Sequence, residues 1–387
     1  MLPMRQSYRI IPVYTADVSG VCSALYELGG MTVMHDPSGC NSTYNTHDEI
    51  RWYDQDSLIF ISGLSEIDAI MGNDNKLIHD IEKAASDLHP QFIALAGSPI
   101  PYMNGTDFPA IAQVIEQETR IPTFSVPTTG MHDYVYGAGI ALAEIAERFT
   151  DPGCRCTDQR TLNLIGVTPL DFGPLSHVKK LKENLESRGW KIVSTWAMGD
   201  ELEQLSRAGE AAVNLVVSSV GIRAAKVLER KFHTPYVIGT PVGGFTKTIS
   251  EILEQTVSKR IDWENGDGDK PVNRIAYLEK RLPGDPQITL IGEPVTMGSL
   301  VASIEQKISR PVQIICPLDE TKGLLGPNDV AVRGEEEAEE KLKDAKIIVA
   351  DPLYHPICPE GCQFCELPHI AFSGRIYVKR LLPLAEM

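Results

Sequence analysis

The feature that most limits the folds open to this chain is the alternation of short β-rich runs with amphipathic helical stretches along nearly all of its 387 residues. Strands that are separated by helices form parallel sheets, because the connection between them is a right-handed crossover that contains the helix. A chain of this length buries several hydrophobic cores, so two or three domains are expected. The sequence therefore predicts an α/β protein with Rossmann-like open parallel sheets.

Two polar breaks divide this pattern into three units. The first break is the turn-rich segment 151–158, and the second is segment 262–271, which is rich in Asp and Gly. We predict an N-terminal α/β domain over residues 1–158, a middle one over 159–270 and a C-terminal one over 271–387. The expected strands are 32–35, 57–62, 91–96, 122–126, 162–167, 191–196, 214–218, 236–239, 287–291, 312–316 and 346–350. The expected helices are 76–88, 108–118, 133–148, 175–188, 222–231, 296–308 and 335–345.

Three cysteines, Cys358, Cys362 and Cys365, lie within eight residues near the end of the sequence. This spacing allows all three thiols to turn toward one centre, and thiolates so placed suit soft metals, above all an iron–sulfur cluster. One alternative is three coincidental thiols in a loop. A zinc site is another, although structural zinc normally has four protein ligands. The spacing is also that of radical S-adenosylmethionine enzymes, which usually carry it near the start of a barrel.

The composition limits the partners and the location of the protein. A net charge of −16 argues against a nucleic-acid partner and offers no basic stripe for a membrane surface, but it suits a partner with a basic docking face. The sequence has no signal peptide and no segment that could span a bilayer, so we expect a cytoplasmic protein. In that compartment the eight cysteines are expected to be ligands or buried thiols rather than disulfides.

In open parallel sheets, ligands lie beyond the carboxyl ends of the strands. This rule selects the loops 36–40, 97–101 and 358–365. Neither a phosphate-binding P-loop nor a dinucleotide fingerprint is present, so any ATP hydrolysis has to come from another chain. Gly243, Gly244 and Lys247 form a glycine turn that opens a helix, which suits either an anion cradle or an ordinary helix start.

Several stretches, taken in order, resemble the nitrogenase component 1 family: Asp-Pro-Ser-Gly-Cys at 36–40, Gly-Leu-Ser-Glu at 63–66, Ile-Met-Gly-Asn-Asp at 70–74, Asn-Leu-Val-Val-Ser-Ser at 214–219 and Phe-Thr-Lys-Thr-Ile at 245–249. The similarity is closest to the α chain of the molybdenum–iron protein and to the scaffold subunit that assembles its cofactor. The resemblance implies three α/β domains and pairing with a second chain, as a homodimer or with a paralogue. It also implies electron supply from an ATP-hydrolysing iron protein.

The resemblance places Cys40, on the turn with Gly39, at the family's interface-cluster cysteine. The other two cluster cysteines of the family fall near Thr15 and Ser98, so a full eight-iron interface cluster is not expected. A homodimer that contributes Cys22 and Cys40 twice would still provide four thiolates for one [4Fe–4S] cluster. The alternative for Cys22 is a small buried side chain on a helix.

The resemblance also places Ser218 at the position of the cofactor cysteine and the cofactor histidine near Pro368 or His369. We therefore expect Cys358, Cys362 and Cys365 to hold the active-site metal, either as a [4Fe–4S] cluster or as a larger metallocluster. Cys154 and Cys156 are expected to be exposed linker thiols, with a contribution to metal binding as the alternative, and Cys316 is expected to be a core residue.

The predicted activity is that of a nitrogenase-like oxidoreductase component, an iron–sulfur enzyme that reduces an unidentified substrate anaerobically. His355 and His369 flank the cysteine loop and are the candidate catalytic proton donors, because the ordinary pKa of histidine suits proton transfer near neutral pH. The alternatives are a non-catalytic scaffold or carrier for metallocluster assembly and, with less support, a radical S-adenosylmethionine activity.

Overall fold

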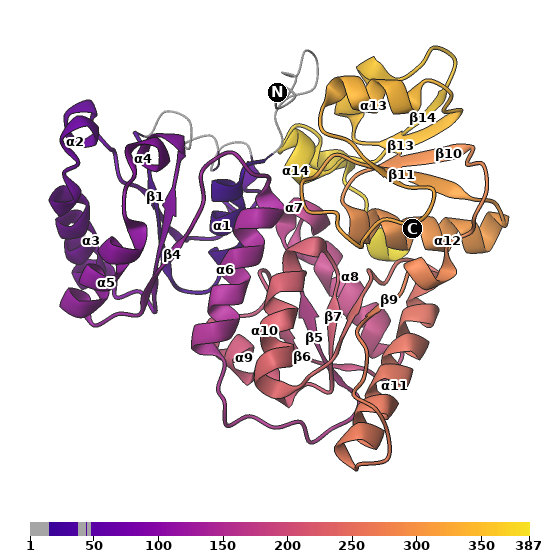
Figure 1. The fold of residues 1–387 in the computed structure, drawn as a ribbon, viewed down its shortest axis with the longest axis horizontal. Helices are drawn as coiled ribbons and strands as arrows, with labels where there is room; N and C mark the ends of the chain where they lie inside the picture. The colour runs from indigo at the N-terminus through magenta and orange to yellow at the C-terminus, as the bar shows by residue number, and fades with distance from the viewer. Residues whose placement is uncertain (1–14, 38–43, 45–47) are drawn as a thin grey trace.

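The computed structural model describes residues 15–37, 44 and 48–387, and the structural statements below refer to these residues. It contains three parallel sheets in sequence order, which confirms the predicted α/β class with three open sheets. Figure 1 shows the first sheet in indigo and purple, the middle sheet in magenta and salmon, and the third in orange and yellow. Among the described helices, none is both long and apolar enough to cross a membrane.

The first sheet has the strand order β2-β1-β3-β4, and every neighbouring pair is parallel. Helices α3 and α5 pack on one face through apolar side chains such as Ile81 and Ile115, which meet Val33 and Leu95 of the sheet. The strands are β1 (Met31–His35), β2 (Leu58–Ile61), β3 (Ile93–Gly97) and β4 (Thr123–Val126). The helices are α1 (Asp17–Leu25), α2 (Glu66–Met71), α3 (Asp74–Leu88), α4 (Pro99–Asn104), α5 (Phe108–Thr119) and α6 (Tyr134–Phe149).

The middle sheet has the order β6-β5-β7-β8-β9 and is also fully parallel. Its last strand begins at residue 274, beyond the predicted domain boundary at residue 270. The strands are β5 (Thr161–Ile165), β6 (Lys191–Thr195), β7 (Val213–Val216), β8 (Tyr236–Ile238) and β9 (Arg274–Ile275). The helices are α7 (Pro169–Phe172), α8 (Leu175–Glu186), α9 (Leu202–Ser206), α10 (Ile222–Phe232) and α11 (Phe245–Glu264).

The third sheet has the order β12-β11-β10-β13-β14. Its edge strand β14 lies where the sequence predicted only a cysteine loop, and it pairs in parallel with β13. The strands are β10 (Ile288–Ile291), β11 (Val312–Cys316), β12 (Val330–Ala331), β13 (Ile347–Ala350) and β14 (Gln363–Glu366). The helices are α12 (Pro294–Ile308), α13 (Glu335–Leu342), α14 (Ile370–Ser373) and the 3₁₀ segment η5 (Pro352–Ile357).

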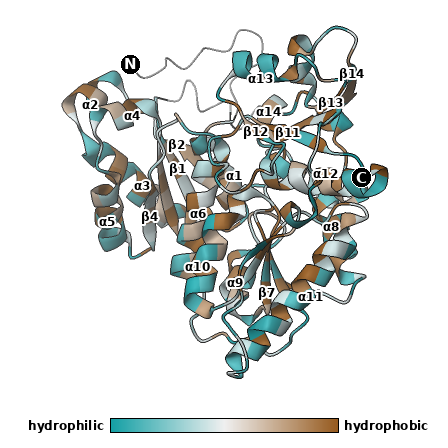
Figure 2. Cartoon of the chain, turned by 45° about the vertical axis from the view of Figure 1, so that its right-hand side comes forward, coloured by the Kyte–Doolittle hydropathy of each residue, from teal (hydrophilic) through white to brown (hydrophobic). Residues whose placement is uncertain are grey.

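Helices α1 and α6 lie side by side between the first two sheets, and two glycines permit this close approach (Figure 1). A Cβ atom on Gly137 would stand 1.9 Å from the carbonyl oxygen of Asp17, and one on Gly20 would stand 2.2 Å from that of Tyr134. No side chain fits at either position. Figure 2 shows apolar residues along the strands, whereas the outer helix α13 is hydrophilic.

The last residues of the chain return to the middle domain. The side-chain amide of Asn184 donates to the carbonyl oxygen of Ala385 at 3.0 Å, and Lys180 forms an ion pair with Glu386 at 2.5 Å. The backbone of Met387 packs against Gly243, which precedes α11. The end of the C-terminal segment therefore packs on elements of the middle domain.

Candidate functional site

A buried carboxylate, Asp171, lies where side chains from all three domains meet. It belongs to α7, directly after β5, and Ser218 follows the neighbouring strand β7. The strand order of the middle sheet reverses between β5 and β7, which is the position where open parallel sheets bind ligands. The site therefore lies at the topological switch point of the middle sheet.

Three hydroxyl groups donate to the Asp171 carboxylate. Tyr134, at the start of α6, donates to Oδ1, and Ser218 donates to Oδ2 at 2.7 Å. Thr168 also donates to Oδ2, at 3.0 Å. Hydrogen bonds to hydroxyl donors stabilise the charged form of a buried carboxylate and fix its orientation. The Asp171 side chain is fully buried, so the carboxylate depends on these partners rather than on water.

His369 joins the same carboxylate from the third domain. Its Nε2 atom lies 3.3 Å from Oδ1 of Asp171, although the contact is not aligned as a straight hydrogen bond. Its Nδ1 atom is buried and has no hydrogen-bond partner among the described residues. The ring stacks on Phe372 with centroids 4.6 Å apart, and the backbone N–H donates to Asp351 at 2.8 Å. The predicted catalytic residue His369 is therefore held against Asp171, to which Ser218 also donates.

A second buried carboxylate, Glu293, connects the third domain to this cluster. It precedes α12 and accepts from the backbone N–H groups of Thr296 at 2.7 Å and of Ser219 at 2.9 Å. Burial and the nearby charge of Asp171 raise the pKa of Glu293. The same two causes raise the pKa of Tyr134 well above its ordinary value. The cluster thus combines a phenol, an imidazole and two carboxyl groups away from solvent, an arrangement suited to holding and transferring protons.

The sequence analysis selected His369 and noted Ser218 only as the position of the family's cofactor cysteine, and it missed Tyr134, Asp171 and Glu293. A signal was available for the two carboxylates, because each lies within a few residues after a predicted strand and so near the carboxyl edge of a sheet. Tyr134 gave no such signal, since it reads as an ordinary apolar residue in the first turn of a helix.

The structure brings two of the three C-terminal thiols together. Cys358 lies close enough to Cys362 for a side-chain hydrogen bond, and burial together with this neighbour raises the pKa of Cys358 to about 12. Cys365 lies within β14, where successive side chains alternate between the two faces of the strand. Phe364 packs on the core, so Cys365 faces the opposite side.

The structure therefore groups Cys358 with Cys362 and places Cys365 on the following strand, β14. No group of three or more His, Cys, Asp or Glu side chains in the described part of the chain is arranged to hold a metal ion. An iron–sulfur cluster with three cysteine ligands fits the chemistry of this donor set, and Cys358, Cys362 and Cys365 remain its predicted ligands. His355 packs its ring against Phe364, with centroids 4.8 Å apart, and is not part of the Asp171 cluster.

The predicted interface-cluster residues are only partly described. Gly39 and Cys40 lie outside the described residues. Cys22 is fully buried in α1, and burial and the charge of Glu49 raise its pKa, which disfavours a thiolate. This environment supports the alternative of a small core side chain for Cys22. Ser98 is buried directly before α4, and its hydroxyl has no hydrogen-bond partner among the described residues.

The glycine turn at the start of α11, which suits an anion cradle by sequence, packs against the C-terminal residue of the chain. Gly243 has a positive φ of 43° and packs against the backbone of Met387, while Gly244 faces open space. Lys247 is exposed and lies 3.9 Å from Glu251 in the next turn of the helix. Glycine at position 243 is therefore explained by the backbone conformation and the close approach of the C-terminal segment.

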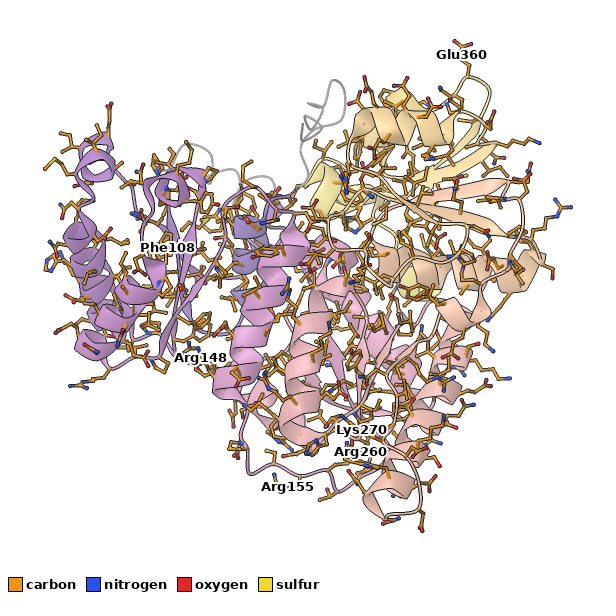
Figure 3. The ribbon with its side chains drawn as sticks, in the orientation of Figure 1. Phe108, Arg148, Arg155, Arg260, Lys270 and Glu360 are labelled. Carbon is orange, nitrogen blue, oxygen red and sulfur yellow. The ribbon has the colours of Figure 1, made fainter. Side chains whose placement is uncertain are left out.

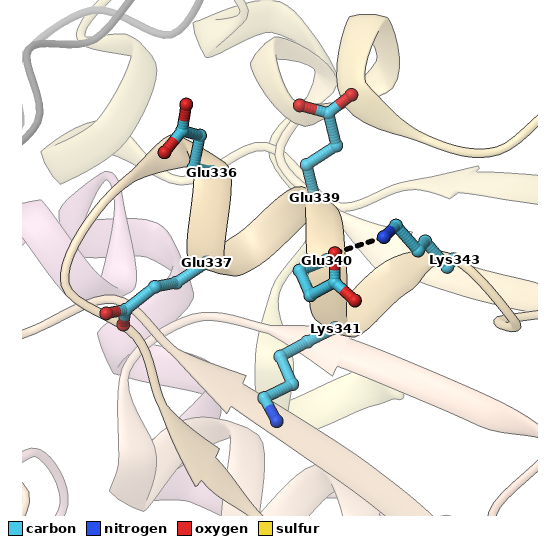
Figure 4. Close-up of a pocket in the computed structure, with 6 residues that line it drawn as sticks. All are labelled: Glu336, Glu337, Glu339, Glu340, Lys341 and Lys343. Atoms are coloured by element: carbon cyan, nitrogen blue, oxygen red, sulfur yellow. Dashed lines mark hydrogen bonds and ion pairs between the residues drawn. The ribbon is translucent and has the colours of Figure 1, made fainter.

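Two surface features lie outside the cluster. Carboxylates on α13, including Glu336, Glu337 and Glu339, point in different directions and do not converge (Figure 4). A pocket of about 630 Å³ beside the linker contains Cys154 and Cys156 and is flanked by Lys231 and Arg260. Both cations already donate to backbone carbonyl oxygens. In Figure 3, Arg155 of this linker lies at the end of the molecule opposite Glu360, which projects from the tip of the C-terminal cysteine loop.

Comparison with known proteins identifies the fold and the family. NifE, a nitrogenase iron-molybdenum cofactor biosynthesis protein, is 26% identical over 237 residues in Klebsiella pneumoniae, which covers 58% of this chain and 51% of that protein. NifE of Clostridium pasteurianum is 24% identical over 318 residues and covers 74% and 67% of the two chains. One subunit of the light-independent protochlorophyllide reductase of Prosthecochloris aestuarii is 25% identical over 228 residues, covering 58% and 42%. The matches therefore span about two fifths to two thirds of the length of these relatives.

Among solved structures, nitrogenase Cp1 at pH 6.5 superposes with a TM-score of 0.66 at 17% identity, covering 95% of this chain and 88% of that chain. The same protein at pH 5 gives a TM-score of 0.59 at 18% identity, with 87% and 72% covered. These matches establish the shared fold. The profile of the nitrogenase component 1 type oxidoreductases matches residues 20–284. The chain therefore belongs to the nitrogenase component 1 type oxidoreductase family.

Proposed function

We propose that this protein is the catalytic component of a nitrogenase-like reductase and receives low-potential electrons from an ATP-hydrolysing iron protein. The observation that carries the proposal is the buried cluster of Tyr134, Asp171, Glu293 and His369 at the carboxyl edge of the middle sheet. Reduction of a bound molecule consumes protons as well as electrons, and this cluster provides groups that bind protons in a water-poor site. The iron–sulfur centre and its cysteine ligands remain part of the proposal.

An exposed apolar patch on the first domain is the surface where we place the iron protein. It consists of side chains from α2 and α4 that are each more than half exposed, and the side-chain amide of Asn104 joins the two helices by donating to Ala69 at 3.3 Å. Patches of this kind on soluble proteins mark docking sites. Carboxylates of Glu66, Asp68 and Asp74 border it and favour a partner with a basic rim. The patch residues are Ile67, Ile70, Met71, Tyr102 and Met103.

The test is electron transfer from an iron protein, followed as MgATP-dependent oxidation of its reduced cluster when this protein is added. We expect oxidation that requires both MgATP and this protein, and we expect Ile70→Asp to slow it at least tenfold because a charge in the centre of an apolar interface is costly to desolvate. Val272→Asp is the matched control, since Val272 is equally exposed but lies outside the patch. Equal rates for the two variants would refute the docking surface, and no MgATP-dependent oxidation would refute the reductase.

The Cys358–Cys362 pair favours a second candidate, a carrier that holds a metallocluster during assembly. Both thiols are half-buried in a loop whose tip projects from the molecule, so a cluster bound there would be accessible to a partner (Figure 3). Cys362→Ala should then lower the iron content of protein purified without oxygen, whereas Cys156→Ala, a half-buried linker thiol, should leave it unchanged. If Cys362→Ala retains full iron content, this loop is not the cluster site.

A further inference from the structure

We propose that Asp171 is a positioning residue, which fixes the ring of His369 so that the neutral imidazole carries its proton on Nε2 and keeps Nδ1 as a free acceptor. The inference deepens the proposed function. It rests on that function only where it gives Nδ1 the role of accepting a hydrogen bond from a bound ligand. The assignment of the imidazole proton to Nε2 depends only on the geometry of the cluster around Asp171.

The ring of His369 is held on several sides. Phe372 stacks on it, with an angle of 28° between the ring planes, and the ring of Tyr134 lies 6.5 Å away. The backbone N–H of His369 is fixed by Asp351 at 2.8 Å. Aromatic packing and an anchored backbone leave the imidazole little freedom to turn. The atom that faces Asp171 is therefore consistently Nε2, at 3.3 Å from Oδ1.

Asp171 determines which form of Nε2 is stable. An ionised carboxylate only accepts hydrogen bonds, so it favours an N–H over a lone pair on the facing nitrogen. The hydroxyl groups of Tyr134, Thr168 and Ser218 all donate to this carboxylate, so both of its oxygens act as acceptors. The neutral ring consequently carries its proton on Nε2, and Nδ1 presents a lone pair.

The remaining ionisable groups around the ring are acidic. Tyr134 comes from α6, Asp171 from α7, and Asp351 directly follows β13. Glu293 interacts electrostatically with Asp171. A ligand that reaches the cluster around Asp171 therefore meets the Nδ1 lone pair among acidic side chains. The hydroxyl of Ser219 is buried beside Glu293 and is directed to its carboxyl group. This chemistry selects a ligand that presents a hydrogen-bond donor, an N–H or O–H group, to Nδ1.

The test is the tautomer of His369, measured by correlation of ring nitrogens and protons in protein labelled with ¹⁵N-histidine, at alkaline pH and without any ligand. His369→Gln identifies the signal among the nine histidines. We expect the Nε2–H tautomer in the wild-type protein. In Asp171→Asn the amide can donate to Nε2, so we expect the Nδ1–H form to become the major one.

Ser218→Ala is the matched control, because it removes one donor to Asp171 but keeps the carboxylate; we expect it to preserve the Nε2–H tautomer. Asp171→Glu, which keeps a carboxylate where Asp171→Asn removes it, should also favour the Nε2–H tautomer. An Nδ1–H tautomer in the wild-type protein would overturn the proposal, and so would an unchanged tautomer in Asp171→Asn. If Asp171→Asn does not fold, the wild-type tautomer still decides. Failure of electron transfer with an intact Nε2–H tautomer would refute only the proposed reductase function.

Discussion

At the scale of single residues, the carboxyl groups that organise this protein are buried and serve the contacts between domains. Asp133 caps α6 by accepting from Val135 at 3.0 Å, and its second oxygen accepts from the backbone of Asp319 in the third domain at 2.7 Å. The sequence predicted a helix beginning at Asp133. It could not predict the second contact, because the partner lies 186 residues away.

The interdomain position of Asp133 predicts a pH dependence of stability. Burial, opposed by its hydrogen bonds, raises the pKa of Asp133 from 3.8 to about 6. The folded protein therefore binds a proton that the unfolded chain has released, and this contribution to stability is present at pH 4 and is lost as the pH rises through about 6. It amounts to at most about 3 kcal/mol.

We expect the difference in free energy of unfolding between the wild-type protein and Asp133→Asn to decrease by about 2–3 kcal/mol between pH 4 and pH 7. Denaturant titrations at several pH values measure this difference. Other buried acids, such as Asp17 and Asp351, cancel in the comparison. The exposed Asp68 has a lowered pKa, so the corresponding difference for Asp68→Asn should change in the opposite direction. A flat difference for Asp133→Asn would contradict the raised pKa.

At the scale of elements, most strands and long helices could be predicted, because their apolar residues follow the strand or helix period. Helix α1 was missed, since all nine of its residues are buried and no polar face marks its period. Strand β14 was missed because its cysteines suggested a metal loop. The first could not be recognised from periodicity, and the second was taken as part of the loop 358–365.

The close packing of α1 on α6 makes a prediction at this scale. Gly137→Ala would bring a methyl group within 1.9 Å of the Asp17 carbonyl oxygen, so the two helices would have to separate. We expect it to reduce the free energy of unfolding by about 3 kcal/mol or more. Gly244→Ala, where the new methyl group meets open space, should change it by less than about 1 kcal/mol. Similar values for the two variants in denaturant titrations would contradict the packing described here.

At the scale of the whole molecule, the three-sheet architecture could be predicted from the alternating pattern and the family resemblance, but the junction could not. Tyr134, Ser218 and His369 approach Asp171 from three domains, and no local pattern connects positions so far apart in sequence. The return of the C-terminal segment to α8 likewise depends on tertiary packing. The site is therefore a property of how the domains meet rather than of any one motif.

The central claim, that this protein carries redox chemistry of its own, is tested most directly by the iron and acid-labile sulfide content of protein purified without oxygen, with EPR of the reduced state. We predict about four irons and four sulfides per chain and an EPR signal of a reduced cluster, as expected for one [4Fe–4S] centre. Zinc alone, or protein free of iron and sulfide under strict anoxia, would contradict the claim.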